Sequence, residues 1–219
     1  MMTNLLIIGA GGHGKVVADC AIEQGDWERI AFLDDLYPGL TEVLGCPVLG
    51  KLSDAEQFVN EYPDAVIAVG NNQRRIELLA TVRGLGFGLS VICHPSAVIS
   101  RTAVIGPGSV LFANSVVNTD ARLGDGCIVN TGATIDHDCV LADGVHISPG
   151  AHLGGAVLVG RASWVGIGAC VRELTVIGGR VLVGAGAAVV GDVPDGVTVT
   201  GVPAEIAQTV ERVMGMATV

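Results

Sequence analysis

Residues 123–158 read LGDGCI-VNTGAT-IDHDCV-LADGVH-ISPGAH-LGGAVL, and this stretch decides the fold because it repeats every six residues. The repeat runs without insertion or deletion over residues 99–194, which hold sixteen hexads. The first residue of every hexad is Val, Ile or Leu, and the fifth is always Ala, Ser, Cys, Val or Thr. A short fixed period of this kind predicts a parallel β-helix, in which each hexad forms one face and a turn and three hexads complete a coil.

The composition agrees with a narrow solenoid and excludes several partners. Half of the 219 residues are hydrophobic, only 4% are aromatic, and 32 are glycine. The formal net charge of −10 argues against a nucleic acid or an anionic membrane as partner. There is no apolar run of about eighteen residues and no basic leader, so neither a membrane helix nor a signal peptide is expected. The six cysteines form no C-x-x-C pair, which favours reduced thiols in a cytoplasmic protein.

The first ninety residues have a different pattern. Short apolar strands are expected over 5–8, 30–33 and 65–69, and helices over about 15–24 and 73–83. The sequence SDAE at 53–56 is read as a capping box that opens a helix towards Tyr62. Strands that alternate with helices predict a small parallel α/β domain. We therefore expect an α/β domain over 1–92, a solenoid over 93–203, and a C-terminal tail or short helix over 204–219.

The first strand leads into a glycine-rich turn. Gly9, Gly11 and Gly14 fit G-x-G-x-x-G, and Asp34 follows the last of them by twenty residues. This is the context of a dinucleotide-binding turn, where a helix N-terminus favours a phosphate. Too few strands precede the hexads for a second mononucleotide-binding half. A nucleotide-linked ligand is therefore favoured over NAD, and a purely structural tight turn stays as the alternative.

His137 is the main candidate for chemistry in the solenoid. It is third in its hexad, at a turn, so its ring should face outward, and it lies between Asp136 and Asp138. A neighbouring carboxylate stabilises the imidazolium and raises its basicity, as a general base requires. The alternative is a solvated histidine between two aspartates that only form the turn.

Residues eighteen apart should stack on the same face of successive coils. This spacing places His137 under Gly155, which leaves space for a ligand over the ring, and His146 under Trp164. His146 and His152 are sixth in their hexads and should also point away from the core. A metal site would need His137, His146 and His152 to converge on one point. Their separation along the coil prevents this within one chain, and only a subunit interface could bring them together.

Five segments together carry a resemblance to a known family: GAGGHGKV (9–16), FLDD (32–35), AVGNNQRR (68–75), NTGATIDHDC (130–139) and GVPA (201–204). Over essentially the whole chain the sequence resembles hexapeptide-repeat sugar acetyltransferases of the sialic acid O-acetyltransferase type. That group includes N-acetyltransferases acting on nucleotide-linked 4-amino sugars, such as the UDP-4-amino-sugar enzyme of bacillosamine synthesis. The resemblance implies a Rossmann-like α/β domain, a left-handed parallel β-helix, a homotrimer, and acetyl-CoA as co-substrate without a metal.

The resemblance also assigns roles to residues. It makes His137 the catalytic base and Asp138 the group that increases its basicity. Ala185 stands where a relative has glycine. Because CoA is often held at this position by backbone groups, an alanine should be tolerated there. Candidates for the sugar nucleotide are Gly11, Gly12, His13, Asp34, Asp35 and Gly70. Candidates for acetyl-CoA are His146, Gly155, Gly166, Ile167 and Ala185.

The hypothesis from the sequence is direct transfer of an acetyl group from acetyl-CoA to the amine of a nucleotide-linked deoxy-amino sugar. The paired Asp34 and Asp35 favour UDP as the nucleotide. The alternative within enzymes is O-acetylation of a sialic-acid-like sugar. Outside enzymes, a non-catalytic nucleotide-sugar sensor and a metal-binding structural trimer are the alternatives.

Overall fold

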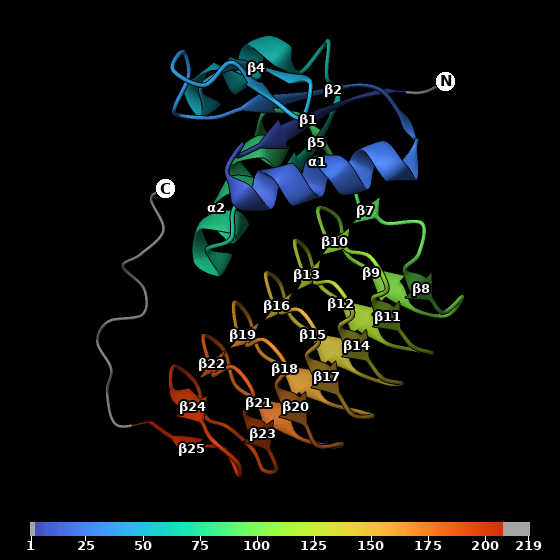
Figure 1. The fold of residues 1–219 in the computed structure, drawn as a ribbon, viewed down its shortest axis with the longest axis vertical. Coiled ribbons are helices and arrows are strands. Elements are labelled where there is room, and N and C mark those ends of the chain that lie inside the picture. The colour runs from blue at the N-terminus through green and yellow to red at the C-terminus, as the bar shows by residue number, and fades with distance from the viewer. Residues whose placement is uncertain (1–2, 208–219) are drawn as a thin grey trace.

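The computed structural model describes residues 3–207, which form an α/β domain stacked on a solenoid (Figure 1). The α/β domain has one six-stranded sheet in the order β3-β4-β2-β1-β5-β6, parallel except for the pair β3 and β4. Its elements are β1 (Thr3–Ile8), α1 (Gly12–Gln24), β2 (Trp27–Leu33), β3 (Glu42–Val43), β4 (Cys46–Gly50), η1 (Leu52–Phe58), β5 (Asp64–Ile67), α2 (Asn72–Gly84) and β6 (Gly88–Leu89).

Strand β1 is buried on both faces because a helix covers each side of the sheet. Leu5 and Ile7 belong to the apolar cluster that contains α1, whereas Leu6 and Ile8 belong to the cluster that contains α2. This explains why the strand is a continuous apolar run instead of an alternating one.

Two helices of this domain differ from the sequence prediction. Helix α1 begins at Gly12, three residues before the predicted start. The segment after Gly50 is a 3₁₀ helix rather than an α-helix, and the predicted cap led by Ser53 is wrong. The backbone amide of Lys51 donates instead to Asp54 Oδ2 at 2.9 Å, so the acidic side chain caps the turn one residue upstream of Leu52.

The solenoid consists of three sheets of short parallel strands, each two residues long except β24, and only β25 is antiparallel among its described strands. The first solenoid sheet holds β7 (Ile92–Cys93), β10 (Val110–Leu111), β13 (Ile128–Val129), β16 (His146–Ile147), β19 (Trp164–Val165), β22 (Leu182–Val183), β24 (Thr198–Thr200) and the antiparallel β25 (Glu205–Ile206). The second holds β8 (Val98–Ile99), β11 (Val116–Val117), β14 (Thr134–Ile135), β17 (His152–Leu153), β20 (Cys170–Val171) and β23 (Ala188–Val189). The third holds β9 (Val104–Ile105), β12 (Arg122–Leu123), β15 (Val140–Leu141), β18 (Leu158–Val159) and β21 (Val176–Ile177).

The register of the sheets confirms the hexad reading. Ile128 pairs with Val110 on one side and His146 on the other, each eighteen residues away. The first hexad residues and the small fifth residues form the core, and Cys127 and Cys139, both at the fifth position, are fully buried in it. The predicted C-terminal helix falls after residue 207, outside the described residues.

Helix α1 packs across the first solenoid sheet, so the two domains share an apolar cluster. Val17 and Ala21 of α1 belong to the same cluster as Val110 and Ile128 of the solenoid. The side chain of Gln24 accepts a hydrogen bond from the backbone of Cys93 at 2.9 Å. The α/β domain therefore lies over the first solenoid sheet, with α1 across it (Figure 1).

Helix α2 runs along one edge of the solenoid and contacts successive coils. Leu79 packs on Gly126, and Ile76 packs on Gly144 one coil later. The side-chain amide of Asn72 donates to the carbonyl of Ala162 in the following coil at 3.1 Å. The pitch of an α-helix, about 5.4 Å, is close to the spacing of neighbouring strands in a sheet, about 4.8 Å. Successive turns of α2 can therefore contact successive coils of the solenoid.

Candidate active site

The loops at the carboxyl ends of β1, β2 and β5 lie side by side. The Gly9 amide donates to the Leu33 carbonyl at 2.9 Å, and the Ala68 amide donates to the Ile8 carbonyl at 2.8 Å. The candidate sugar-nucleotide residues Gly11, Asp34 and Gly70 follow these three strands. The structure therefore brings them to one edge of the sheet, where ligands of parallel α/β folds bind.

The glycines of the first turn fall into two kinds. Gly9 has φ +105°, and a Cβ on Gly14 would collide with the Gly9 carbonyl oxygen, so both are needed for the tight turn. Gly11 and Gly12 have open space where a Cβ would stand. They therefore expose backbone at the N-terminus of α1, where an anionic group is favoured.

The two aspartates after β2 have different surroundings. Both carboxylate oxygens of Asp34 accept backbone hydrogen bonds, from Ala10 at 2.7 Å and from Leu36 at 2.9 Å. Asp35 is exposed. Asp34 therefore holds the glycine-rich turn in place, and Asp35 is the one whose carboxylate faces solvent.

His13 and His146 lie at the junction of the two domains. His13 packs edge-on against Phe112, with ring centroids 5.7 Å apart, and His146 stacks on Trp164 at 4.7 Å, as the spacing predicted. Burial, with a smaller contribution from the Arg75 charge, lowers the pKa of His13 to about 4 and that of His146 to about 3. Both rings are therefore neutral at pH 7.

His146 points away from the solenoid core, as predicted, yet it is buried and only 7% exposed. A sixth-position side chain faces solvent only where nothing covers the sheet, and here the α/β domain approaches it. His146 Nε2 is 3.3 Å from Asn130 Nδ2, whereas His146 Nδ1 and His13 Nε2 are buried with no partner among the described residues.

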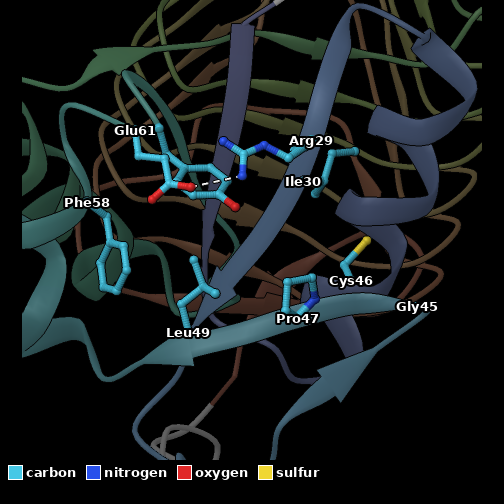
Figure 2. Close-up of a pocket in the computed structure, with 9 residues that line it drawn as sticks. Arg29, Ile30, Gly45, Cys46, Pro47, Leu49, Phe58 and Glu61 are labelled. Atoms are coloured by element: carbon cyan, nitrogen blue, oxygen red, sulfur yellow. Dashed lines mark hydrogen bonds and ion pairs between the residues drawn. The ribbon is translucent and has the colours of Figure 1, made fainter.

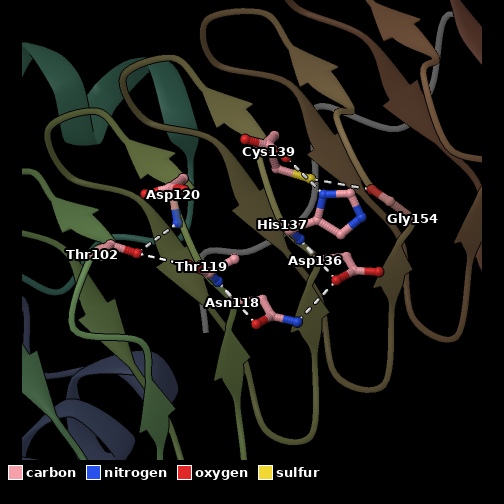
Figure 3. A network of polar contacts seen from close by, with 9 residues as sticks. Thr102, Asn118, Thr119, Asp120, Asp136, His137, Cys139 and Gly154 are labelled. Atoms are coloured by element: carbon pink, nitrogen blue, oxygen red, sulfur yellow. Dashed lines mark hydrogen bonds and ion pairs between the residues drawn. The ribbon is translucent and has the colours of Figure 1, made fainter.

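His137 lies exposed at the corner between the second and third solenoid sheets (Figure 3). Its Nδ1 is 2.7 Å from Asp138 Oδ2, and its backbone amide donates to Asp136 Oδ1 at 2.8 Å. The hydrogen bond to Asp138 raises the pKa of His137, and the charge of Asp136 raises it further. The predicted stacking of His137 under Gly155 is confirmed, because a Cβ on Gly155 would lie 2.6 Å from the imidazole Nε2. The ring itself fills the space that the glycine leaves, so the predicted room for a ligand between them is wrong.

The candidate acetyl-CoA residues lie on more than one corner. Ile167 and Ala185 are eighteen residues apart at the corner between the first and second solenoid sheets, and Ile167 is 61% exposed. A Cβ on Gly166 would collide with the Val183 carbonyl oxygen, so only glycine fits at this position. Gly155 belongs to the corner of His137. One chain therefore separates the His137 corner from the Ile167 corner by the width of the second sheet.

Arg75 is a residue of this region that the sequence reasoning missed. It is 1% exposed, and its guanidinium connects the end of β5 to the solenoid. The signal was present in the sequence, since Asn72, Arg75, Ile76 and Leu79 follow the i, i+3, i+4, i+7 spacing of a buried helix face.

A separate hollow lies elsewhere on the α/β domain (Figure 2). It has a volume of about 510 Å³ and is bounded by β2, β4 and the segment after η1, with Arg29, Pro47 and Tyr62 among its lining residues. Arg29 and Pro47 stand near the amino ends of their strands, away from the edge that carries Gly11 and Gly70. Over residues 3–207, no three His, Cys, Asp or Glu side chains gather to hold a metal, and no helix could cross a bilayer.

Comparison with known proteins adds an independent line of evidence. Residues 4–82 match a family model described as the PglD N-terminal domain. The UDP-N-acetylbacillosamine N-acetyltransferase of Bacillus subtilis (strain 168) is 40% identical over 121 residues, in a match that covers 51% of this chain. The match spans about half the length of that relative, 52%.

Solved structures match over nearly the whole chain. The acetyltransferase domain of PglB from Neisseria gonorrhoeae FA1090, in complex with acetyl coenzyme A, is 47% identical with a TM-score of 0.91, covering 94% of this chain and 100% of that one. PerB from Caulobacter crescentus, in complex with CoA and GDP-perosamine, is 37% identical with a TM-score of 0.90, covering 95% and 99%. These similarities confirm the predicted fold class, an α/β domain followed by a left-handed parallel β-helix.

Proposed function

Because this chain belongs to the family of hexapeptide-repeat sugar acetyltransferases, we propose that it transfers an acetyl group from acetyl-CoA to the amine of a nucleotide-linked 4-amino sugar. The observation that carries this proposal is the exposed pair of His137 and Asp138, whose imidazole lies against Gly155 of the next coil. The nucleotide is held at the edge formed by Gly11, Gly12 and Gly70, and UDP is the nucleotide we propose.

The geometry of His137 suits a general base. In its neutral form the ring donates from Nδ1 to Asp138, which leaves the lone pair of Nε2 free to accept a proton. The substrate amine attacks the thioester carbonyl, Nε2 takes the proton that the amine loses, and the C–S bond breaks to release CoA. Holding both substrates in one groove supplies the proximity, so no acyl-enzyme is required.

The active site is proposed to form between chains of a homotrimer. Within one chain, the His137 corner, the Ile167 corner and the nucleotide edge over the first sheet lie on different parts of the solenoid surface. A neighbouring chain that brings its Ile167 corner to the His137 corner would complete the groove for acetyl-CoA.

The experiment is an assay of CoA release from acetyl-CoA with a thiol reagent. Acceptors are UDP-, GDP- and dTDP-linked 4-amino sugars, with the matching 4-hydroxy sugars and free sialic acid as controls. We expect release with amino-sugar nucleotides and the greatest kcat/KM with a UDP sugar. Release only with hydroxyl acceptors would contradict N-acetylation, and a greater kcat/KM with GDP would overturn the choice of nucleotide.

His137→Asn tests the base directly. The variant keeps a polar side chain of similar size, so the fold and both substrate affinities should persist. We expect kcat to fall by about 10²–10⁴-fold, the usual contribution of a general base. His152→Asn, an exposed histidine on the second sheet, is the matched control. Near-full activity of His137→Asn would show that another group takes the proton.

A further inference from the structure

Arg75 combines complete burial with complete hydrogen bonding. It is 1% exposed, and no carboxylate of the described residues forms an ion pair with it. Burial lowers its pKa to about 10, so the guanidinium still carries its charge at pH 7. Its five N–H groups all have oxygen acceptors. Nε donates to Gly126 O (2.8 Å), Nη1 to Val69 O (2.9 Å) and Gly70 O (3.3 Å), and Nη2 to Asn72 Oδ1 (2.8 Å) and Gly144 O (2.8 Å).

These acceptors come from both domains. Gly126 and Gly144 occupy the same corner of two successive coils of the solenoid, eighteen residues apart. Val69 and Gly70 form the turn that leaves β5, and the preceding Ala68 lies against Gly9. One side chain thus connects the solenoid to the turn that lines the carboxyl edge of the sheet.

The charge of Arg75 also acts on that edge. It contributes to the lowered pKa of both His13 and His146, so its field reaches both sides of the domain junction. In a chain with a net charge of −10, a buried cation at this place favours an anionic group near the N-terminus of α1.

We propose that Arg75 is a positioning residue for the sugar-nucleotide site: it fixes the turn at Val69 and Gly70 to the solenoid and supplies positive potential beside the bound diphosphate. The inference rests on the proposed function for the identity of the ligand. It does not assign Arg75 any contact with the reacting atoms, because all its donors are already used. Its loss should therefore weaken nucleotide binding without changing the chemical step.

The test uses Arg75→Lys and Arg75→Met in the full chain. Lysine keeps the charge but replaces a five-donor fork with three donors, and methionine removes charge and donors together. We expect the KM for the sugar nucleotide to rise by about 10-fold for lysine, and further for methionine, since hydrogen bonds to charged groups are the stronger ones. The kcat and the KM for acetyl-CoA should stay within about 3-fold of wild type.

Arg83→Met is the matched control. Arg83 lies on the same helix and also connects it to the solenoid, through an exposed ion pair with Asp125. Exposed pairs contribute little, so neither KM should change. A folded Arg75→Lys variant with a wild-type KM for the sugar nucleotide would overturn the proposal, and so would an equal rise in both KM values.

Two further measurements keep the outcome decisive. If neither Arg75 variant folds, Asn72→Ala removes one acceptor of Arg75 and should raise the sugar-nucleotide KM alone; an unchanged KM would reject the proposal. If the wild-type chain acetylates no amino-sugar nucleotide, the proposed function fails. Calorimetry with UDP and GDP then decides about Arg75 alone: affinity lowered by Arg75→Lys but not by Arg83→Met supports it, and equal or undetectable binding in all three proteins refutes it.

Discussion

At the scale of single residues, the two histidines of interest owe opposite properties to their surroundings. His137 is exposed beside two carboxylates, which raise its pKa, whereas His146 is buried near a guanidinium, and burial lowers its pKa to about 3. The same imidazole therefore suits proton transfer in one place and neutral packing or ligand contact in the other.

Asp138→Asn is predicted to shift the pH–rate profile. The hydrogen bond from Asp138 is the largest cause of the raised pKa of His137, and the base works only when deprotonated. Removing the carboxylate should lower this pKa, so the acidic limb of kcat/KM should move to lower pH. The loss of kcat should be smaller than for His137→Asn. An acidic limb at the wild-type pH would mean that another group titrates.

The buried histidines are predicted to make the fold sensitive to acid. The folded pKa values of about 4 for His13 and about 3 for His146 lie below the unfolded value of 6.5. At a pH between the folded and the unfolded pKa, the unfolded chain therefore binds more protons than the folded chain. The stability they contribute is present above pH 6.5 and is lost as the pH falls towards 4, by up to about 1.4 kcal/mol per pH unit for each histidine.

Urea denaturation between pH 7.5 and 4.5 measures this effect. His146→Gln should lose less stability on acidification than wild type, because one of the two groups no longer titrates. His152→Gln, which replaces an exposed histidine, is the control and should follow the wild-type curve. Equal pH dependence in all three proteins would contradict the role given to burial.

At the scale of elements, α2 is the helix whose spacing matches the solenoid. Leu79, Ile76 and Asn72 face three successive coils, where Gly126 and Gly144 leave room for the helix. Both glycines have positive φ, yet Ala162 adopts φ +59° at the equivalent corner of the next coil. The corner geometry alone therefore does not demand glycine; the close approach of α2 does.

Gly144→Ala is predicted to destabilise the protein more than Gly168→Ala. Both glycines have φ +66°, so both variants carry the same backbone strain. A Cβ at 144 would collide with Ile76, whereas a Cβ at 168 would meet open space. Overpacking of this kind costs about 1–3 kcal/mol, and that difference should appear in thermal or urea denaturation. Equal stabilities would show that α2 moves away at no cost.

At the scale of the whole molecule, the two domains form a single packed unit. Ile92, Val110 and Ile128 on the first solenoid sheet share an apolar cluster with α1. Removing the α/β domain would expose them together with Phe112, so substrate binding by each domain is best tested in the full chain.

The protein is predicted to be a homotrimer in solution. One chain leaves the His137 and Ile167 corners apart on its surface. The site proposed above therefore requires a neighbouring chain to join them. Light scattering at micromolar concentration should give three times the 22.3 kDa of one chain. A stable monomer with full acetyltransferase activity would contradict a site shared between chains.

The sequence by itself determined the solenoid, because the hexad repeat is a local pattern in which the first and fifth residues of each turn must be apolar or small. It also determined that His137 lies outward beside Gly155, since stacking follows from counting eighteen residues. The tertiary structure alone decided the burial of His146 and the groups that Arg75 contacts in the solenoid. Both depend on where the α/β domain docks on the first solenoid sheet, and no local pattern encodes a contact between residues so far apart in the chain. The capping of η1 is a local contact instead, and there the sequence pattern pointed to the wrong residue: the Asp54 side chain accepts from the Lys51 amide, in place of the cap predicted at Ser53.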